Sequence, residues 1–206
     1  MTQELIEAIE LAGDLFNQST HRIIWNLFLA FIPLALSFYL FRLPAIRNLW
    51  WWILLLIFIA FLPNAPYILT DSIHILELSQ QNYPRWAIAI ILIPQYILFI
   101  TLGFEAYVVS LTKLAGYLKA FCTSQQIGAI KILLHSLSIV GVYIGRFERF
   151  NSWDFVTKPG VVLLTTLEDI ANGEKLISMA IAVVILRLLT AVITLVNSQI
   201  EQQLAK

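Results

Sequence analysis

The sequence predicts an all-α membrane protein: a polytopic bundle of five transmembrane helices with a further amphipathic helix at the N-terminus. Of its 206 residues, 59% are hydrophobic and only 13% are charged, whereas soluble domains are typically about half apolar and about a quarter charged. The mean hydropathy is +0.81. Five stretches are apolar over the roughly 20 residues that a helix needs to cross a hydrocarbon core of about 30 Å.

The expected elements follow one another without a long linker, so residues 1–206 are expected to form a single membrane domain. Residues 1–20 are expected to form an amphipathic interfacial helix, because their apolar side chains recur at i, i+3 and i+4. The five predicted spans are residues 23–41, 49–69, 86–104, 127–145 and 176–196. Residues 161–167 are apolar but too short to span, which predicts an interfacial or re-entrant segment after the fourth span.

Composition excludes several classes of function. The formal net charge is zero, so nothing in the overall charge favours nucleic acid as a partner. Cys122 is the sole cysteine, which rules out an intramolecular disulfide and a cysteine metal cluster.

Five spans place the two termini on opposite sides of the membrane. Lysine and arginine are nearly balanced between the sides, with a slight preference for an outside N-terminus and a cytoplasmic C-terminus.

The second span contains a break. Pro63 and Pro66 flank Asn64, and each proline leaves a carbonyl about one turn back without its helical partner. Asn64 is suited to satisfy such a carbonyl, because its amide donates hydrogen bonds. Two interpretations stay open: a broken helix that lines a cavity, or a helix end at the interface with Asn64 as its cap.

Ionisable residues follow the break. Asp71 and His74 are three apart and share a helix face, from which Glu77 begins to drift. They are candidates for a proton-handling pair or a metal site. The favoured interpretation is an interfacial helix whose Asp71 caps it or pairs with an arginine. The spacing supplies no third ligand, so no metal and no cofactor is expected.

Arg146 and Arg149 are also three apart and would form a two-pronged cationic face on a helical continuation. They would either form ion pairs with Asp71, Glu77 or Asp154, clamping two loops together, or bind a lipid phosphate or another anion. The clamp is favoured, because unpaired charges near hydrocarbon are unfavourable. Asn151 and Asp154 resemble a cap that ends the helix.

The predicted topology brings the stretches at 62–77 and 141–159 to the same membrane face, where they would form one polar platform. The proposed binding residues are Asn64, Asp71, His74, Arg146, Arg149, Asn151 and Asp154. A separate charge, Arg187, lies at the middle of the fifth span, where it costs roughly 2.5–3.5 kcal/mol. We expect it to face inward and to pair with Glu105, or failing that with Asp71.

Three functions are compatible with these features. The platform would bind a lipid headgroup or a membrane-protein partner, which is the interpretation that we favour. The broken helix with Glu105, His135 and Arg187 would suit a small proton-coupled transporter. Asp71 and His74 would suit a membrane enzyme as an acid/base pair. Common catalytic motifs, such as a Gly-rich phosphate loop and His-Glu-x-x-His, are missing, which disfavours the enzyme.

Two stretches carry a resemblance to a known family. LPNAPYILTDSIH at 62–74 and GVYIGRFERFNSWD at 141–154 resemble the signature stretches of a bacterial membrane family, domain of unknown function 1361. Trp25-Asn26 matches a further feature of that family, near its first span. The resemblance implies a multi-span protein of the bacterial inner membrane and implies no established activity.

Overall fold

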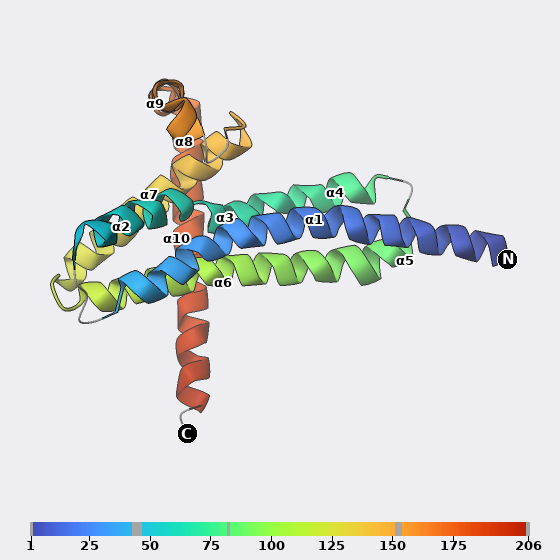
Figure 1. Ribbon diagram of the computed structural model, residues 1–206, viewed down its shortest axis with the longest axis horizontal. Helices are drawn as coiled ribbons and strands as arrows, with labels where there is room; N and C mark the ends of the chain where they lie inside the picture. The colour runs from blue at the N-terminus through green and yellow to red at the C-terminus, as the bar shows by residue number, and fades with distance from the viewer. Residues whose placement is uncertain (1, 43–46, 82, 151–153, 205–206) are drawn as a thin grey trace.

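The structure, a computed structural model, describes residues 2–42, 47–81, 83–150 and 154–204, and its regular elements in these ranges are all helical (Figure 1). Five helical stretches are long and apolar enough to cross a membrane, which confirms the expected number and order of candidate spans. They are Ile6–Leu40, Leu49–Ser79, Arg85–Leu118, Ser124–Arg146 and Gly173–Leu204.

The first helix differs from the expectation. α1 runs unbroken over Thr2–Leu40, so the expected interfacial helix at 1–20 and the expected span at 23–41 are one element. Neither glycine nor proline interrupts the polar turns that separate the two apolar parts, so nothing ends the helix there. Its N-terminal part packs on α6 (Ile93–Leu118), where the Ser19 hydroxyl donates to Gln95 Oε1 over 2.7 Å.

The proline break does not end the second span. α2 (Leu49–Phe61) is followed within two residues by α3 (Asn64–Tyr67), η1 (Ile68–Ser72) and α4 (Ile73–Ser79). Pro63 and Pro66 lie at the start of the new helix, where a backbone N–H needs no helical partner. Asp71 and His74 therefore lie on a continuation of the span that reaches Ser79, and not in a loop beyond residue 69.

The third and fourth spans also extend past their expected ends. The third consists of α5 (Arg85–Ala87), η2 (Ile88–Leu92) and α6. η2 is a π-helix that lies just before Pro94, and such a wide turn relieves the clash between a proline ring and the preceding turn. α7 (Ser124–Arg146) begins at a capping box in which Thr123 and Gln126 exchange hydrogen bonds.

The C-terminal region contains α8 (Asp154–Thr157), α9 (Pro159–Ala171) and α10 (Gly173–Leu204). The expected segment at 161–167 lies within α9. The Asn172 side chain accepts hydrogen bonds from the backbone N–H groups of Glu174 and Lys175, which caps the start of α10. α10 packs mainly on α7 and α9, and Figure 1 shows it crossing the direction of α1 and α6.

Glycines allow α6 and α7 to approach the proline break closely. A Cβ atom at Gly141 of α7 would lie 2.7 Å from Pro63 Cβ and Cγ, and one at Gly145 would lie 3.4 Å from the Tyr67 ring. A Cβ atom at Gly103 of α6 would lie within 3.3 Å of three side-chain atoms of Ile68. Close packing at small residues is the usual way in which membrane helices associate. It places the end of α7 beside α3 and η1.

Candidate functional site

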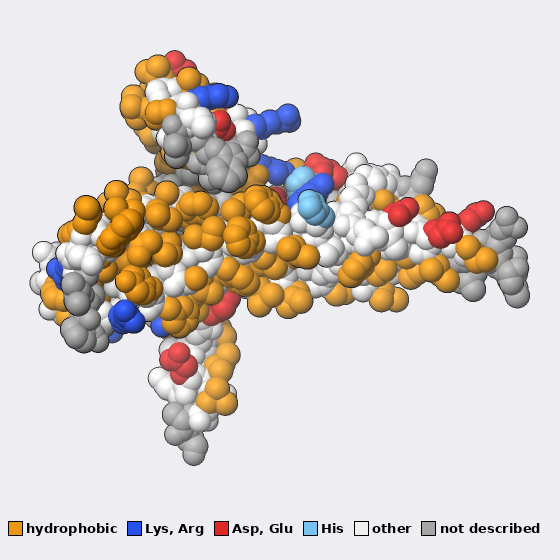
Figure 2. All heavy atoms as spheres, viewed as in Figure 1, with side chains coloured by type: hydrophobic (Ala, Val, Ile, Leu, Met, Phe, Trp, Pro, Cys, Tyr) orange, Lys and Arg blue, Asp and Glu red, His pale blue; other side chains and the backbone are white. Residues whose placement is uncertain are grey.

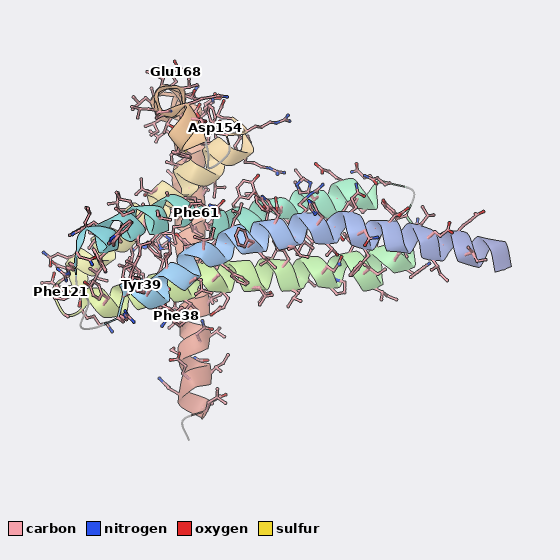
Figure 3. The ribbon with its side chains drawn as sticks, in the orientation of Figure 1. Phe38, Tyr39, Phe61, Phe121, Asp154 and Glu168 are labelled. Atoms are coloured by element: carbon pink, nitrogen blue, oxygen red, sulfur yellow. The ribbon has the colours of Figure 1, made fainter. Side chains whose placement is uncertain are left out.

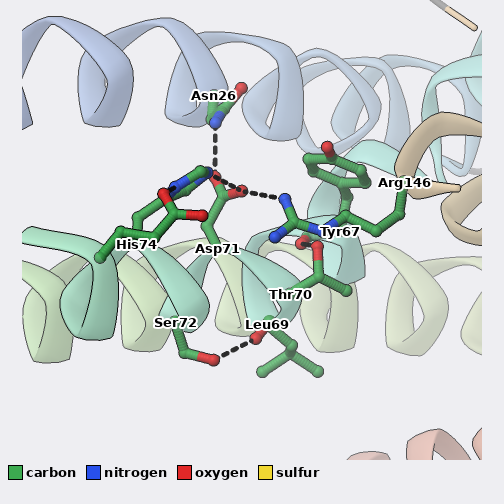
Figure 4. Close-up of polar contacts among 9 residues, drawn as sticks. Asn26, Tyr67, Leu69, Thr70, Asp71, Ser72, His74 and Arg146 are labelled. Carbon is green, nitrogen blue, oxygen red and sulfur yellow. Dashed lines mark hydrogen bonds and ion pairs between the residues drawn. The ribbon is translucent and has the colours of Figure 1, made fainter. Parts of the chain in front are cut away.

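Asp71 lies at the centre of a polar cluster that joins three helices (Figure 4). This residue lies on η1 and is only 1% exposed. One carboxylate oxygen, Oδ2, accepts a hydrogen bond of 2.6 Å from Asn26 Nδ2 of α1. The other, Oδ1, lies 3.9 Å from Arg146 Nη1 at the end of α7. The buried carboxylate is therefore satisfied by an amide and by a guanidinium from two distant parts of the chain.

His74 extends this cluster along α4. Its Nδ1 lies 2.5 Å from Glu77 Oε2, and its Nε2 lies 3.8 Å from Asp71 Oδ1. Both contacts follow from the three-residue spacing, which places side chains on one helix face. Among the described residues, no group of three or more His, Cys, Asp or Glu side chains has the geometry to hold a metal ion. His74 therefore connects Asp71 to Glu77 through two polar contacts.

The two arginines do not share a helix face. α7 ends at Arg146, and Arg149 has a φ of 58°, in the left-handed region that non-glycine residues rarely adopt. This backbone turn separates the two side chains, so the expected two-pronged cationic face on a helical continuation is not formed. Arg146 reaches Asp71, as the clamp interpretation expected. Arg149 is exposed and has no ion pair within the part of the chain that the structure describes.

A cavity of about 390 Å³ lies beside this cluster, where the two signature stretches and α1 meet. Asn26, Asn64 and Arg149 provide polar lining, and Asn26 also donates to Asp71. Several rings provide the aromatic lining: Trp25, Phe61, Tyr67, Phe150 and Phe155. Asn64 Nδ2 donates to the Phe61 carbonyl over 3.0 Å. Asn64 therefore satisfies a carbonyl at the break and lines the cavity. The interpretation of the break as the end of the span does not hold, because the helical stretch continues to Ser79.

The proposed platform also included Asp154 and Asn151. Asp154, at the start of α8, lies 3.9 Å from Lys158 Nζ, and Figure 3 shows it well above the α2–α3 junction that carries Phe61. Asn151 lies outside the described residues. Figure 2 shows basic, acidic and histidine side chains gathered in one area over α1 and α4, beside a broad apolar surface.

A second charged cluster was not expected from the sequence. Lys175 Nζ lies 2.6 Å from Asp169 Oδ1 and 3.5 Å from Glu148 Oε1. Glu148, which stands between the two arginines in the sequence, is thereby directed towards α9 and α10. The only sequence signal for this cluster is that acidic residues lie near Lys175 along the chain. Mixed charges of this kind are common on solvated helices.

The expected ion pair between Glu105 and Arg187 is not formed in the described structure. Glu105 Oε1 accepts a hydrogen bond of 2.5 Å from Asn197 Nδ2, also on α10. Asn197 lies ten residues beyond Arg187, which is about 15 Å along a helix, so Glu105 meets α10 at a different level. The second expected partner, Asp71, is occupied by Asn26 and Arg146. Arg187 is exposed instead of facing inward.

Comparison with known proteins bears on the whole site. No curated protein and no solved structure matches the chain significantly. A family described as "Protein of unknown function (DUF1361)" matches residues 25–190. The matched range contains the Asp71 cluster and every residue that lines the cavity, and it agrees with the resemblance at 62–74 and 141–154. The chain therefore belongs to the DUF1361 family of proteins of unknown function.

Proposed function

We propose that this multi-pass membrane protein binds the phosphate of an anionic lipid headgroup in the cavity between α1, α3 and α7. One observation carries the proposal: Arg149 lines that cavity from an exposed position and has no ion pair within the described residues. A guanidinium group matches a phosphate in a bidentate way. The cavity therefore offers a cation that the neighbouring acids leave available.

The surroundings of Arg149 support a headgroup in preference to a small free anion. Asn26 and Asn64 add amide donors to the lining, and aromatic rings form much of the remainder. Aromatic residues favour the level of lipid headgroups, where one side of a ring is apolar and the other is polar. The left-handed backbone at Arg149 is a further support, because strained backbone clusters at ligand-binding positions.

The proposal predicts that lipid binding depends on Arg149. In protein purified in nanodiscs, Arg149→Gln is expected to weaken the binding of an anionic phospholipid about tenfold, because a charge-assisted hydrogen-bonded contact is lost. Native mass spectrometry with phosphatidylglycerol titrated against phosphatidylcholine measures this change. The lipid affinity of Arg149→Lys is expected to lie between that of the unaltered chain and that of Arg149→Gln, since an ammonium keeps the charge without the bidentate geometry.

Lys119→Gln provides the matched control, because Lys119 is an exposed cation at the α6–α7 turn, away from the cavity. It is expected to bind the lipid as the unaltered chain does. Equal losses for Arg149→Gln and Lys119→Gln would show that the binding reflects only the total charge. Unchanged binding by Arg149→Gln would reject the cavity as the headgroup site.

The proposed location is the bacterial inner membrane, with the N-terminus outside and the cavity on the outer face. Cys122, as the sole cysteine, tests this orientation, because it follows α6 on the opposite face. A maleimide that does not cross membranes is expected to label Cys122 in inverted vesicles and not in intact cells. Gln80→Cys in a Cys122→Ser background is expected to give the reverse pattern. Labelling of Cys122 in intact cells would contradict the orientation.

A further inference from the structure

Arg187 is an exposed cation at the centre of an apolar helix. α10 is uncharged from Leu176 to Leu186 and again from Leu188 to Ile200. The nearest charged residues of the helix are Lys175 and Glu201, each roughly 20 Å away at 1.5 Å per residue. A guanidinium group remains protonated in proteins. The fifth candidate span therefore carries a permanent charge at the middle of its length, from which the side chain does not reach either end of the helix.

A second cation lies close to the first. Lys131 is half-buried on α7, which packs along α10, and the charges of Lys131 and Arg187 act on each other and on His135. His135 is 2% exposed, and its Nδ1 is engaged by the Tyr107 hydroxyl over 2.8 Å. Neither cation has an ion pair in the described ranges of the chain. The α7–α10 pair thus holds two cations that no acid among the described side chains neutralises.

The surface beside Arg187 is apolar and faces away from the chain. Val184, Leu188 and Leu195 are each at least 58% exposed, and helical spacing places them on one face with Arg187 at its edge. Figure 1 shows the C-terminal half of α10 extending beyond the other helices. One side of this half packs on the described chain, where Thr190 is buried and Asn197 contacts Glu105 of α6. Its opposite, apolar side is exposed over a length on which a second helix could pack.

These observations limit what neutralises the cations. Lipid phosphates lie at the bilayer surface, about half the hydrocarbon thickness from a central residue. A carboxylate on a neighbouring transmembrane helix lies at the required depth, and pairing removes much of the penalty for a central charge. We infer that the outer face of α10 binds a transmembrane helix of a partner protein that carries an Asp or Glu at mid-depth, opposite Arg187 and Lys131. This inference goes beyond the proposed headgroup site and does not depend on it.

The test uses the full chain in nanodiscs of phosphatidylcholine and a fluorescent peptide probe. The probe is a leucine-rich transmembrane helix with one central Asp, and its matched control has Leu at that position. The Asp peptide is expected to bind about tenfold more tightly than the Leu peptide. Arg187→Gln is expected to remove this preference, whereas Arg85→Gln, at an exposed arginine that begins α5, is expected to keep it.

A charge exchange keeps the test independent of folding defects. The Arg187→Glu variant is expected no longer to bind the Asp peptide and to bind instead a peptide with a central Lys. Equal binding of the Asp and Leu peptides by the unaltered chain would overturn the inference, as would an Asp preference that survives Arg187→Gln. Dimers of the chain alone that Arg187→Gln abolishes would assign the face to a second copy instead. Displacement of the Asp peptide by a few per cent of phosphatidylglycerol would assign the cations to lipid.

Discussion

Replacing Asp71 with alanine is expected to lower the free energy of unfolding by about 3 kcal/mol. Asp71 is 1% exposed, and it receives a 2.6 Å hydrogen bond from Asn26 and lies 3.9 Å from the Arg146 guanidinium. Removing one member of a buried charge pair leaves the other without a partner, which costs about 3–5 kcal/mol. The lower value applies because Arg146 is partly exposed. Reversible unfolding in mixed micelles measures the change.

Glu77→Gln is the matched control for Asp71, because Glu77 is an acid two turns away whose side chain is 56% exposed. Its contact with His74 is a solvent-exposed pair, and pairs of this kind contribute little to stability. We therefore expect a large loss of unfolding free energy for Asp71→Ala and a small loss for Glu77→Gln. Comparable small losses for both variants would mean that Asp71 does not join the helices.

Gly141→Ala is expected to destabilise the protein by about 1–3 kcal/mol, as is usual when a packed interior is overfilled. The new Cβ atom would lie 2.7 Å from two atoms of the Pro63 ring. A proline ring is fixed to the backbone and does not rotate away, so α7 itself has to move. The measurement is the midpoint of thermal unfolding, followed by the same lipid titration that is used for Arg149.

Gly128→Ala is the control for this substitution. Gly128 lies on the same helix, but a Cβ atom there would meet nothing within 4 Å. Alanine at that position is expected to stabilise the helix by up to about 1 kcal/mol, because glycine has the greater conformational entropy in the unfolded chain. A loss at Gly128 equal to that at Gly141 would show that the effect is one of helix content and not of contact with Pro63.

The candidate spans could be predicted from sequence because each depends on local composition. Their ends could not, since these depend on whether a polar or proline-containing turn stops the helix. The turns around Ser19 contain no stop signal and pack on α6, so α1 continues through them. Pro63 and Pro66 fall in the first turn of a new helix that runs on to Ser79. A proline is compatible with either outcome, and only the tertiary packing of Gly141 and Gly145 decides between them.

The candidate site was predictable in part. The order of the spans is sufficient to bring Asp71 and Arg146 together, because the stretches that carry them emerge on one face. The direction of Arg149 was not predictable, because a φ of 58° at a non-glycine residue has no local sequence signal. For Asn26, the only sequence signal was the family resemblance at Trp25-Asn26, although Asn26 connects Asp71 to the cavity. The prediction that Glu105 pairs with Arg187 was wrong, because opposite charge does not determine where along α10 Glu105 makes contact, which is at Asn197.

The central claim is that residues 62–77 and 141–159 meet, and a double-mutant cycle on Asp71 and Arg146 tests it most directly. The free energy of unfolding is measured for Asp71→Asn, Arg146→Gln and the double variant, with Lys158→Gln replacing Arg146→Gln in a parallel cycle. The account predicts a coupling of about 1 kcal/mol or more between Asp71 and Arg146, and none between Asp71 and Lys158. Additive losses in the first cycle would show that the two stretches do not meet and would contradict the account.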